Sequence, residues 1–265
     1  MKIVSWNINS VRLRAQTVVR MMDILNPDIV CLQETKTPDE FFPHEIFSDA
    51  GYAHQHIQGM KSYNGLAIIS KHPFIKTEIH HRCGKEDCRH IAAHFEGFDL
   101  HNLYIPAGGD EPDPDINDKF AHKLNFVEEM TEWFADKYKS SDRVVTVGDF
   151  NIAPYEHDVW SHKQLLNVVS HTPPETKRLE AMRQSLDFVD SARKFVPMDE
   201  KSYSWWSYRN RDWRKSNRGR RLDHIWVSKP LENALKKYAI HEDARDWDKP
   251  SDHIPIMIEL DLSSS

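Results

Sequence analysis

The sequence lacks the features of a membrane or secreted protein. It contains no run of about eighteen apolar residues, the length that a membrane span requires. Its first residues, MKIVSWNINS, lack the basic and apolar segments of a secretory signal. Its three cysteines, Cys31, Cys83 and Cys88, are too few for a disulfide framework and suit a reducing compartment. We therefore expect a cytoplasmic protein with no membrane partner, and we take a monomer as the default.

The chain also lacks visible internal boundaries. It has no Gly/Ser-rich or Pro-rich linker, no repeat at a fixed period and no low-complexity segment. We therefore predict a single domain over residues 1–265. Hydrophobic residues make up 39% of the sequence, which is enough for a sizeable core, and charged residues make up 29%, which indicates a well-solvated surface.

Positive charge is scarce overall but concentrated locally. The formal net charge of −6 argues against a protein that coats nucleic acid nonspecifically, because affinity for phosphate backbones comes largely from Lys and Arg. From Arg209 to Arg221, however, Asp212 is the only acid among seven basic residues, whereas GGDEPDPDIND, from Gly108 to Asp118, is strongly acidic. A basic face on an acidic body is a usable footprint for an anionic partner.

Short β-branched runs alternate with amphipathic segments. Strands are predicted at residues 3–6, 28–32, 65–70, 99–105, 144–147, 223–227 and 254–260. Apolar periodicity predicts helices over residues 11–25 and 118–139, and both apolar stripes are typical of core packing. Consecutive strands mixed with helices favour an α/β (α+β) fold in which stacked sheets carry helices on the outside.

Polar side chains adjoin four of these predicted strands at their ends. Any one of them could cap a turn, since Asp and Asn at strand ends commonly bond to their own backbone. Four such ends, rich in carboxylates and amides, are better explained as one site at one edge of packed strands. The residues are Asn7, Asn9, Gln33, Glu34, Asp149, Asn151, Asp252 and His253.

These residue types predict a metal-assisted hydrolysis. Clustered hard oxygen ligands suit Mg²⁺ or Mn²⁺, and the scarcity of thiolates and imidazoles disfavours zinc. Hydrolysis of a phosphate ester requires a neutralised substrate charge, a deprotonated water and a stabilised leaving oxygen. A metal on Glu34 would supply the first and third, and His253 paired with a carboxylate would supply the second, because imidazole titrates near neutral pH.

Six segments in their order resemble the successive motifs of a known superfamily. SWNINS, DIVCLQETK, LYIPAGG, VGDFN, RGRRLDHIW and KPSDHIPI look like those of the endonuclease/exonuclease/phosphatase superfamily, and within it the exonuclease III family of abasic-site DNA repair nucleases. The resemblance runs from Lys2 to about Leu260 and implies a four-layered sandwich of two mixed β-sheets flanked by helices. The implied activities, all on duplex DNA in base-excision repair, are Mg²⁺-dependent incision 5′ to abasic sites, 3′-to-5′ exonuclease action and removal of blocking 3′ groups.

The resemblance also implies roles for individual residues. It makes Tyr104 a phosphate-contacting phenol, Asp149 an acid/base residue and Asn151 a transition-state or phosphate contact, while Asp223 orients His253. The implied catalytic residues are Tyr104, Asp149, Asn151, Asp223 and His253. The implied metal-site residues are Asn7, Glu34, Asp149, Asn151, Asp252 and His253. The expected DNA contacts are Asn9, Arg89, Arg209, Arg211, Arg214 and Arg220.

The sequence departs from the family pattern around the expected substrate pocket. Repair enzymes of the family often hold a flipped abasic sugar in a small apolar and aromatic pocket. The matching positions here carry His171, Arg220 and Leu222, which disfavours abasic specificity and leaves exonuclease or 3′-trimming activity untouched. Ala107 stands where an amide side chain is usual, and we expect the acidic segment 110–118 to face away from the duplex or to screen it.

Two other functions stay open at this stage. A phosphatase or phosphodiesterase acting on a lipid or small phosphate ester would not need the basic aromatic run SWWSYRNRDWRKSNRGRR, residues 204–221. A DNA-binding module that has lost catalysis would not need the complete set of Glu34, Asp149, Asn151, Asp223, Asp252 and His253. Trp205 and Trp206 either fill a sheet interface or stack on bases. HHRCGKEDCRHIAAH is either a polar hairpin loop or a zinc site that includes Cys83 and Cys88.

Overall fold

Two six-stranded β-sheets form the centre of the protein, whose computed structural model describes residues 1–210 and 212–264. The first sheet contains, in spatial order, β11 (Leu235–Ile240), β12 (Ile256–Leu260), β1 (Lys2–Asn7), β2 (Ile29–Gln33), β4 (Leu66–Ser70) and β3 (His54–Gln58). The second contains β5 (Lys76–Ile79), β6 (His90–Phe95), β7 (Phe98–Tyr104), β8 (Val144–Asp149), β10 (Asp223–Val227) and β9 (Val189–Asp190). Both sheets are mixed, because β1 runs parallel to β2 and β7 runs parallel to β8 while their other neighbours are antiparallel.

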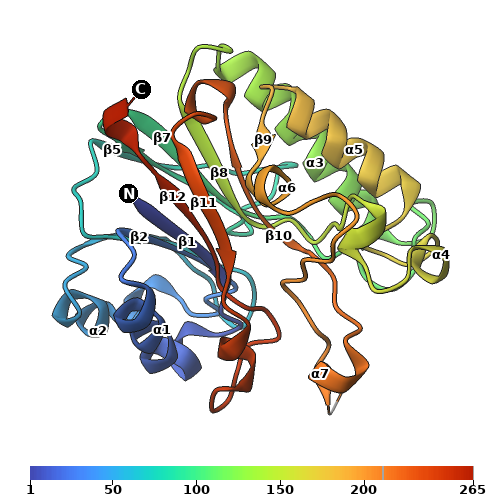
Figure 1. Cartoon of the computed structure of the whole chain (residues 1–265), viewed down its shortest axis with the longest axis horizontal. Coiled ribbons are helices and arrows are strands. Elements are labelled where there is room, and N and C mark those ends of the chain that lie inside the picture. The colour runs from blue at the N-terminus through green and yellow to red at the C-terminus, as the bar shows by residue number, and fades with distance from the viewer. Residues whose placement is uncertain (211, 265) are drawn as a thin grey trace.

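Helices cover the outer face of each sheet, so the molecule has four layers (Figure 1). The helices are α1 (Val11–Leu25), α2 (His44–Asp49), α3 (Asp118–Lys137), α4 (His162–Leu165), α5 (Pro173–Gln184), α6 (Ser191–Phe195) and α7 (Trp213–Ser216). Helices α1 and α2 pack on the first sheet, whereas α3 and α5 lie side by side on the second. The predicted fold class, a sandwich of two sheets flanked by helices, is confirmed.

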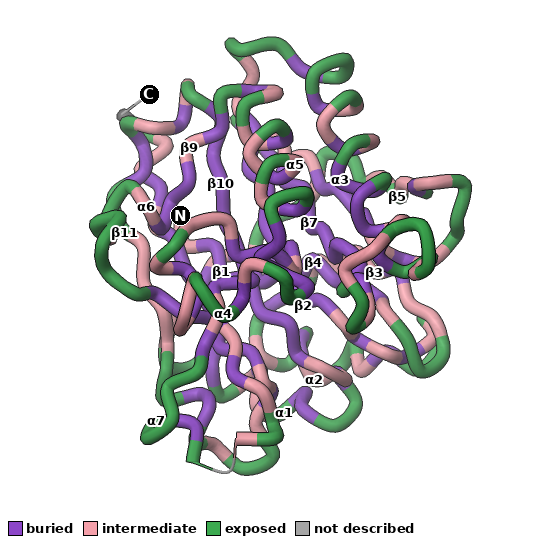
Figure 2. Tube along the Cα trace, turned by 90° about the vertical axis from the view of Figure 1, so that its right-hand side faces the viewer, coloured by how far each residue is buried: buried purple, intermediate pink, exposed green. Residues whose placement is uncertain are grey.

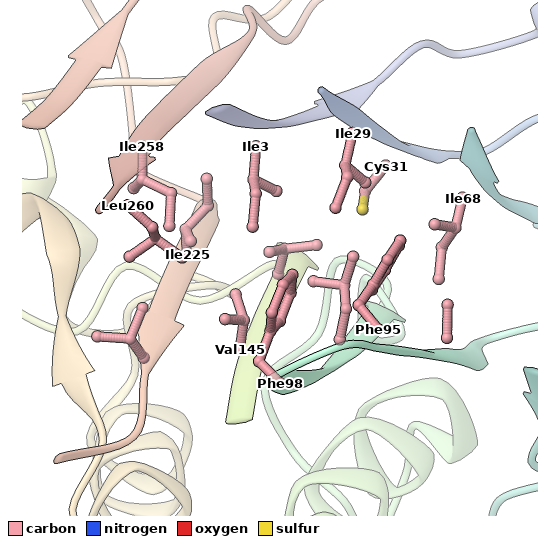
Figure 3. Close-up of a cluster of buried hydrophobic side chains, with 14 of the residues drawn as sticks. Ile3, Ile29, Cys31, Ile68, Phe95, Phe98, Val145, Ile225, Ile258 and Leu260 are labelled. Atoms are coloured by element: carbon pink, nitrogen blue, oxygen red, sulfur yellow. The ribbon is translucent and has the colours of Figure 1, made fainter. Parts of the chain in front are cut away.

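The main hydrophobic core lies between the two sheets. Ile3 and Ile29 from the first sheet face Val145 and Ile225 from the second, and all four are fully or almost fully buried (Figure 3). The trace in Figure 2 is correspondingly buried through the central strands and exposed mainly in helices and loops. This core holds the sheets together with their strand ends in fixed relative positions.

The two long helices follow their predicted apolar stripes. In α3 the side chains from Phe120 to Phe134 that recur at helical spacing are buried, and the Asn117 side chain caps the helix by accepting a hydrogen bond from the backbone N–H of Lys119. Helix α1 ends at Asn26, which adopts a left-handed conformation. Among the described residues, no helix combines the length and hydropathy needed to cross a bilayer.

Candidate active site

The second sheet places three of the predicted site residues in one row. Asp149 at the end of β8 is directly opposite Tyr104 of β7 on one side and Asp223 of β10 on the other. Directly opposed residues share a face of the sheet, so their side chains are neighbours. Gly148 permits the close approach of β8 to β7, because a Cβ there would lie 1.9 Å from the carbonyl oxygen of Leu103. The row brings a phenol and two carboxyl groups together.

The first sheet brings Asn7 and Glu34 to the same place. Asn7 ends β1, and Glu34 follows β2. The Asn7 amide Nδ2 donates to Glu34 Oε1 and to Asp149 Oδ2, each at 2.8 Å, and the Tyr104 hydroxyl donates to Glu34 Oε1 at 2.8 Å. Polar groups from the ends of strands in both sheets therefore form one network.

His253 lies against two carboxylates of the row. Its Nδ1 is 2.8 Å from Asp223 Oδ2, and its Nε2 is 3.6 Å from Asp149 Oδ2. Burial opposes a charge on the ring, but the two carboxylates outweigh it and raise the pKa of His253 well above its ordinary value. The imidazole is therefore held in its charged form at neutral pH.

Asp149 is the buried carboxyl at the centre of the network. Its Oδ1 accepts from the backbone N–H of Asn151 at 2.9 Å, and its Oδ2 accepts from the Asn151 amide at 3.2 Å. Burial raises the pKa of Asp149 above its ordinary value, although the charge on His253 opposes the shift. A carboxyl shifted toward neutrality is suited to accept a proton near neutral pH.

Glu34 and Asn9 form a cation-binding site that the ammonium group of Lys36 occupies. The Lys36 ammonium is 2.6 Å from Glu34 Oε2 and 2.7 Å from Asn9 Oδ1. Burial opposes ionisation of Glu34, but Lys36 and the Asn7 amide lower the pKa of its carboxyl below the ordinary value. Convergent carboxylate and amide oxygens are the donors that Mg²⁺ prefers, so these residues fit a hard divalent cation.

Asp252 joins the site from the segment before β12. Its Oδ1 accepts from the Asn9 amide and its Oδ2 accepts from the indole N–H of Trp205, both at 3.0 Å. Although burial opposes ionisation, the charge on His253 and these two hydrogen bonds lower the pKa of Asp252. Asp252 is thus an anion on the Asn9 side of the site, where a metal would be held.

Backbone conformations at the site are unusual for residues with side chains. Asn9, Glu34 and Asn151 have φ angles of 47°, 52° and 53°, in the left-handed region that disfavours such residues. Backbone strain of this kind costs on the order of 1–3 kcal/mol per residue and clusters at functional sites. Because asparagine tolerates this region far better than other residues with side chains, the strain falls mainly on Glu34 and supports a functional role for Glu34 alone.

One group of acids and histidines in residues 1–210 and 212–264 is close enough to share a metal ion. It consists of Asp149, Asp223 and His253, all buried. Within this group Asp223 already accepts a hydrogen bond from His253, as in a proton-handling pair, whereas the oxygens of Glu34 and Asn9 already surround a cation, the Lys36 ammonium. Cys83 and Cys88 are not part of any such group, so within the described residues the structure favours the hairpin loop over the zinc site.

A cleft of about 530 Å³ opens above these residues. Its lining includes Glu34, Asn151, Trp205, Arg209, Arg220, Leu222 and His253, with Asp110 of the acidic segment also on its wall. Ala107 lines the cleft as well, whereas His171 is buried and bonds to the carbonyl of Ala153. Of the three positions expected to form the substrate pocket, Arg220 and Leu222 therefore face the cleft and His171 does not.

The predicted DNA-contacting arginines have different surroundings. Arg209 is exposed at the cleft. Arg89 lies over the Tyr104 ring, with 4.9 Å between its Cζ and the ring centroid, and is paired with Asp87. Arg214 is turned toward acidic residues that follow β11 and bonds to Asp246 at 2.7 Å. Arg211 lies outside the described residues.

The basic aromatic run divides between core and cleft. Trp206 is buried and packs against Tyr203 and Trp213, so it fills the interior of the loop that carries α7. Trp205 lines the cleft and holds Asp252. Sequence reasoning missed Lys36 and also Ser204, whose hydroxyl donates to Asp223 Oδ2 at 2.6 Å; QETK itself carries Lys36 and could have indicated a cation beside Glu34.

Comparisons with known proteins agree with this geometry. Residues 4–253 match the Endonuclease/Exonuclease/phosphatase family. The chain is 30% identical to exodeoxyribonuclease III of Haemophilus influenzae over 98% of this chain and 100% of that protein. An AP endonuclease structure from Archaeoglobus fulgidus superposes with a TM-score of 0.92 at 30% identity, over 98% of this chain and 99% of that chain. A 3′ phosphatase from Neisseria, bound to a product DNA hairpin, gives a TM-score of 0.91 at the same identity and coverage.

Proposed function

The chain belongs to the endonuclease/exonuclease/phosphatase family, and on this basis we propose that it is a metal-dependent DNA phosphodiesterase of the exonuclease III type. Its reactions are 3′-to-5′ exonuclease action on duplex DNA and processing of 3′ ends in base-excision repair. One observation carries the proposal. A buried Asp223–His253 pair, the carboxyl of Asp149 and a cation-binding Glu34 meet at the floor of an open cleft.

The metal would be held by Glu34, with Asn7, Asn9 and Asp252 around it. We propose Mg²⁺ because the atoms that would bind it are hard carboxylate and amide oxygens. When bound, it neutralises the phosphate and stabilises the leaving oxygen.

Side chains of the protein perform the remaining tasks of the hydrolysis. The His253 imidazolium, oriented by Asp223, donates a hydrogen bond to a phosphate oxygen and stabilises the negative charge that develops there. Asp149, rather than His253 as expected from the sequence, accepts the proton of the attacking water, because a charged imidazolium has no lone pair to accept it. Tyr104 and Asn151 position the phosphate from the wall of the cleft.

The surroundings of the site support the other expectations of the proposal. The first and last strands, β1 and β12, pair with each other, which supports a single domain over the whole chain. Exposed large apolar side chains such as Phe41, Ile75 and Met198 belong to separate segments, which supports a monomer. The cysteines are free thiols and suit the reducing cytoplasm.

The proposal is tested on two end-labelled duplexes, one with a recessed 3′ end and one with an internal abasic site, each incubated with Mg²⁺ or with a chelator. We expect stepwise shortening of both from the 3′ end, only with Mg²⁺, and its loss in a His253→Asn variant. Incision at the abasic site would add endonuclease activity. Binding without cleavage would indicate a DNA-binding module. If the protein neither binds nor cleaves the duplexes, lipid and small phosphate esters become the substrates to test.

A further inference from the structure

Arg220 places a positive charge without an acidic partner inside the cleft of the candidate active site. Its Nη1 donates to the Val169 carbonyl at 2.9 Å and to the Ser170 hydroxyl at 2.7 Å, both of which are neutral groups. Its Nε is buried and has no hydrogen-bond partner in the part of the chain that the structure describes. Among residues 1–210 and 212–264, Arg220 takes part in no ion pair of the kind that Arg221, its neighbour, makes with Asp158 and Asp190.

Within residues 1–210 and 212–264, the surrounding protein compensates this charge only in part. Burial lowers the pKa of Arg220, and the carboxylate of Glu175 opposes this shift. Glu175 is already paired with the buried Lys123 and accepts hydrogen bonds from Ser170 and Thr172. A half-buried cation without a paired anion costs free energy, so its position in a cleft points to a ligand that carries the missing negative charge.

Backbone pairing places Arg220 two strands away from His253, with Trp205 between them. Arg220 exchanges two backbone hydrogen bonds of 3.0 Å with Trp205, and Trp205 in turn forms a β-bridge with His253. At a strand spacing of about 4.8 Å, the backbones of Arg220 and His253 are therefore roughly 10 Å apart, with Trp205 between them. The Arg220 guanidinium lies 5.4 Å from the Trp205 ring centroid, so the indole separates a phosphate-hydrolysing end of the cleft from a cationic end.

The other charged groups of the cleft do not neutralise the positive charge of Arg220 at the cationic end. Glu34 is neutralised by Lys36, and Asp252 lies beside the His253 imidazolium. Asp110 is exposed, where water screens it. The cationic end therefore remains available to an anion that reaches past the hydrolytic groups.

We infer that Arg220 is a specificity-determining residue that selects DNA 3′ ends whose terminal phosphate is free or esterified to a short carboxylate, in preference to ends that carry a nucleoside or an uncharged sugar. The inference rests on the proposed function. In the reaction, water adds to phosphorus and the bond from phosphorus to the DNA 3′ oxygen breaks. The 3′ oxygen leaves with a proton as a hydroxyl, and the phosphate departs as inorganic phosphate or, where a carboxylate ester is present, as the intact phosphate ester. A free terminal phosphate and a phosphate esterified to a short carboxylate share this chemistry.

The test compares four duplexes of one sequence that differ at a single site: a 3′-phosphate, a 3′-phosphoglycolate, a normal 3′-terminal nucleotide and an internal abasic site. Values of kcat/KM are measured with Mg²⁺ for the unmodified protein, Arg220→Leu and Arg220→Lys. A charge-assisted hydrogen bond supports an effect of about 10- to 100-fold. We expect the ratio of kcat/KM for the anionic ends to that for the nucleotide to fall by this factor in Arg220→Leu and by less in Arg220→Lys.

The outcomes separate the inference from the proposed function. A fall for the phosphoglycolate alone would place the anion of the carboxylate at Arg220, and a fall for both anionic ends would place a phosphate oxygen there; either supports the inference. An equal fall on all four duplexes, at an unchanged Tm, would overturn it, as would an unchanged ratio. If the unmodified protein cleaves none of the four, the proposed function itself fails.

Discussion

Asp223 fixes both the orientation and the charge of His253. The Asp223 Oδ2 atom lies 2.8 Å from His253 Nδ1, and both residues are buried. Ser204 Oγ donates to the same carboxylate oxygen and accepts hydrogen bonds from the backbone N–H groups of Leu222 and Asp223. A carboxylate so held turns Nε2 of the ring toward the substrate cleft and keeps the ring protonated.

Replacing Asp223 by Asn should lower kcat while leaving KM largely unchanged. Asparagine fills a similar volume but removes the negative charge, so the pKa of His253 falls and less imidazolium is present at neutral pH. Loss of one positioned donor to a developing negative charge costs about 10²- to 10³-fold in kcat. The measurement is steady-state cleavage of a 3′-recessed duplex, with Tm as the control for folding.

The pH profile of this variant gives a second readout. With Asp223 the imidazolium persists to high pH, whereas without it the charged form is lost as pH rises through a lower pKa. The alkaline side of the activity profile of Asp223→Asn should therefore move to lower pH. An unshifted alkaline limb would show that Asp223 acts on something other than the charge of His253.

Glu34→Gln should weaken metal binding more than it affects any other part of the reaction. The substitution keeps the acceptor for Asn7 and Tyr104 but removes the charge that now pairs with Lys36. We expect the Mg²⁺ concentration for half-maximal activity to rise about tenfold or more, by analogy with the 10- to 100-fold cost of disturbing ligand surroundings. Glu232→Gln, an ion-paired acid on a surface segment, is the matched control and should leave the metal requirement unchanged. Equal metal requirements in the two variants would exclude Glu34 as a ligand.

The acidic segment beside the cleft should weaken binding to duplex DNA. Asp110 and Glu111 are exposed, and Asp110 lines the same cleft as Arg209. Asp110→Asn/Glu111→Gln should raise duplex affinity by about three- to tenfold at low salt, and by less at high salt, because exposed charges are screened. Glu132→Gln/Asp136→Asn on α3 removes the same charge far along the chain and should change affinity little. Equal effects of the two double variants would mean that net charge alone matters and that the segment is no local screen.

Most interior strands of the two sheets were predicted from the sequence, whereas the interior strand β6 and the edge strands β3, β5, β9 and β11 were not. Residues of β1, β2 and β8 are buried almost throughout and read as continuous apolar runs. In contrast, β3 has the sequence HQHIQ and β5 is largely exposed, because edge strands face solvent and need neither apolar composition nor strict alternation. Their assignment depends on pairing with a neighbour, which local sequence does not record.

The same division applies to the site. Residues at strand ends, such as Asn7, Glu34 and Asp149, could be grouped in advance because carboxylates and amides are unusual where a strand leaves the core. The partners of Arg214 could not, since Asp246 lies 32 residues further along and the pairing follows from how the loop that carries α7 folds onto that segment. The clustering of charges predicts a basic segment, but it does not predict which of its side chains form ion pairs within the protein.

A buried histidine pair should make the protein less stable in mild acid. Arg82 donates to His90 Nδ1, so the His90 Nε2–H donates to His101 Nδ1 at 3.0 Å, and His101 Nε2 donates to the Tyr138 hydroxyl at 2.7 Å. Burial, together with nearby positive charge, lowers the pKa of both histidines well below the ordinary value. Both are therefore neutral in the folded protein, whereas in the unfolded chain they bind protons below about pH 6.5.

The sign of the pH effect follows from this difference. Below about pH 6.5 the unfolded state holds more protons, so the free energy of unfolding falls with falling pH by up to about 1.4 kcal/mol per pH unit for each histidine. Denaturant unfolding at pH 7.5 and 5.5 measures the fall in the free energy of unfolding between the two pH values. His101→Gln should make this fall smaller by the contribution of one histidine. Tyr138→Phe removes the hydroxyl partner but neither histidine, so it should lower stability at both pH values alike. A pH dependence that His101→Gln leaves unchanged would contradict the assignment.

Arg209 and Arg214 should differ in their contribution to DNA binding although they are close in sequence. Arg209 is exposed at the cleft, whereas the Arg214 guanidinium contacts Asp246 at 2.7 Å and Asp243 at 3.4 Å. An arginine that contacts a phosphate releases about one counterion on binding, so Arg209→Ala should reduce the slope of log affinity against log salt by about one. Arg214→Ala should leave the slope unchanged because its charge is already compensated within the protein. Binding titrations over a range of salt concentrations on an uncleaved duplex, with chelator present, measure both slopes. If Arg214→Ala lowers the slope instead, its ion pairs must break when DNA binds, and the α7 loop then forms part of the DNA-binding surface.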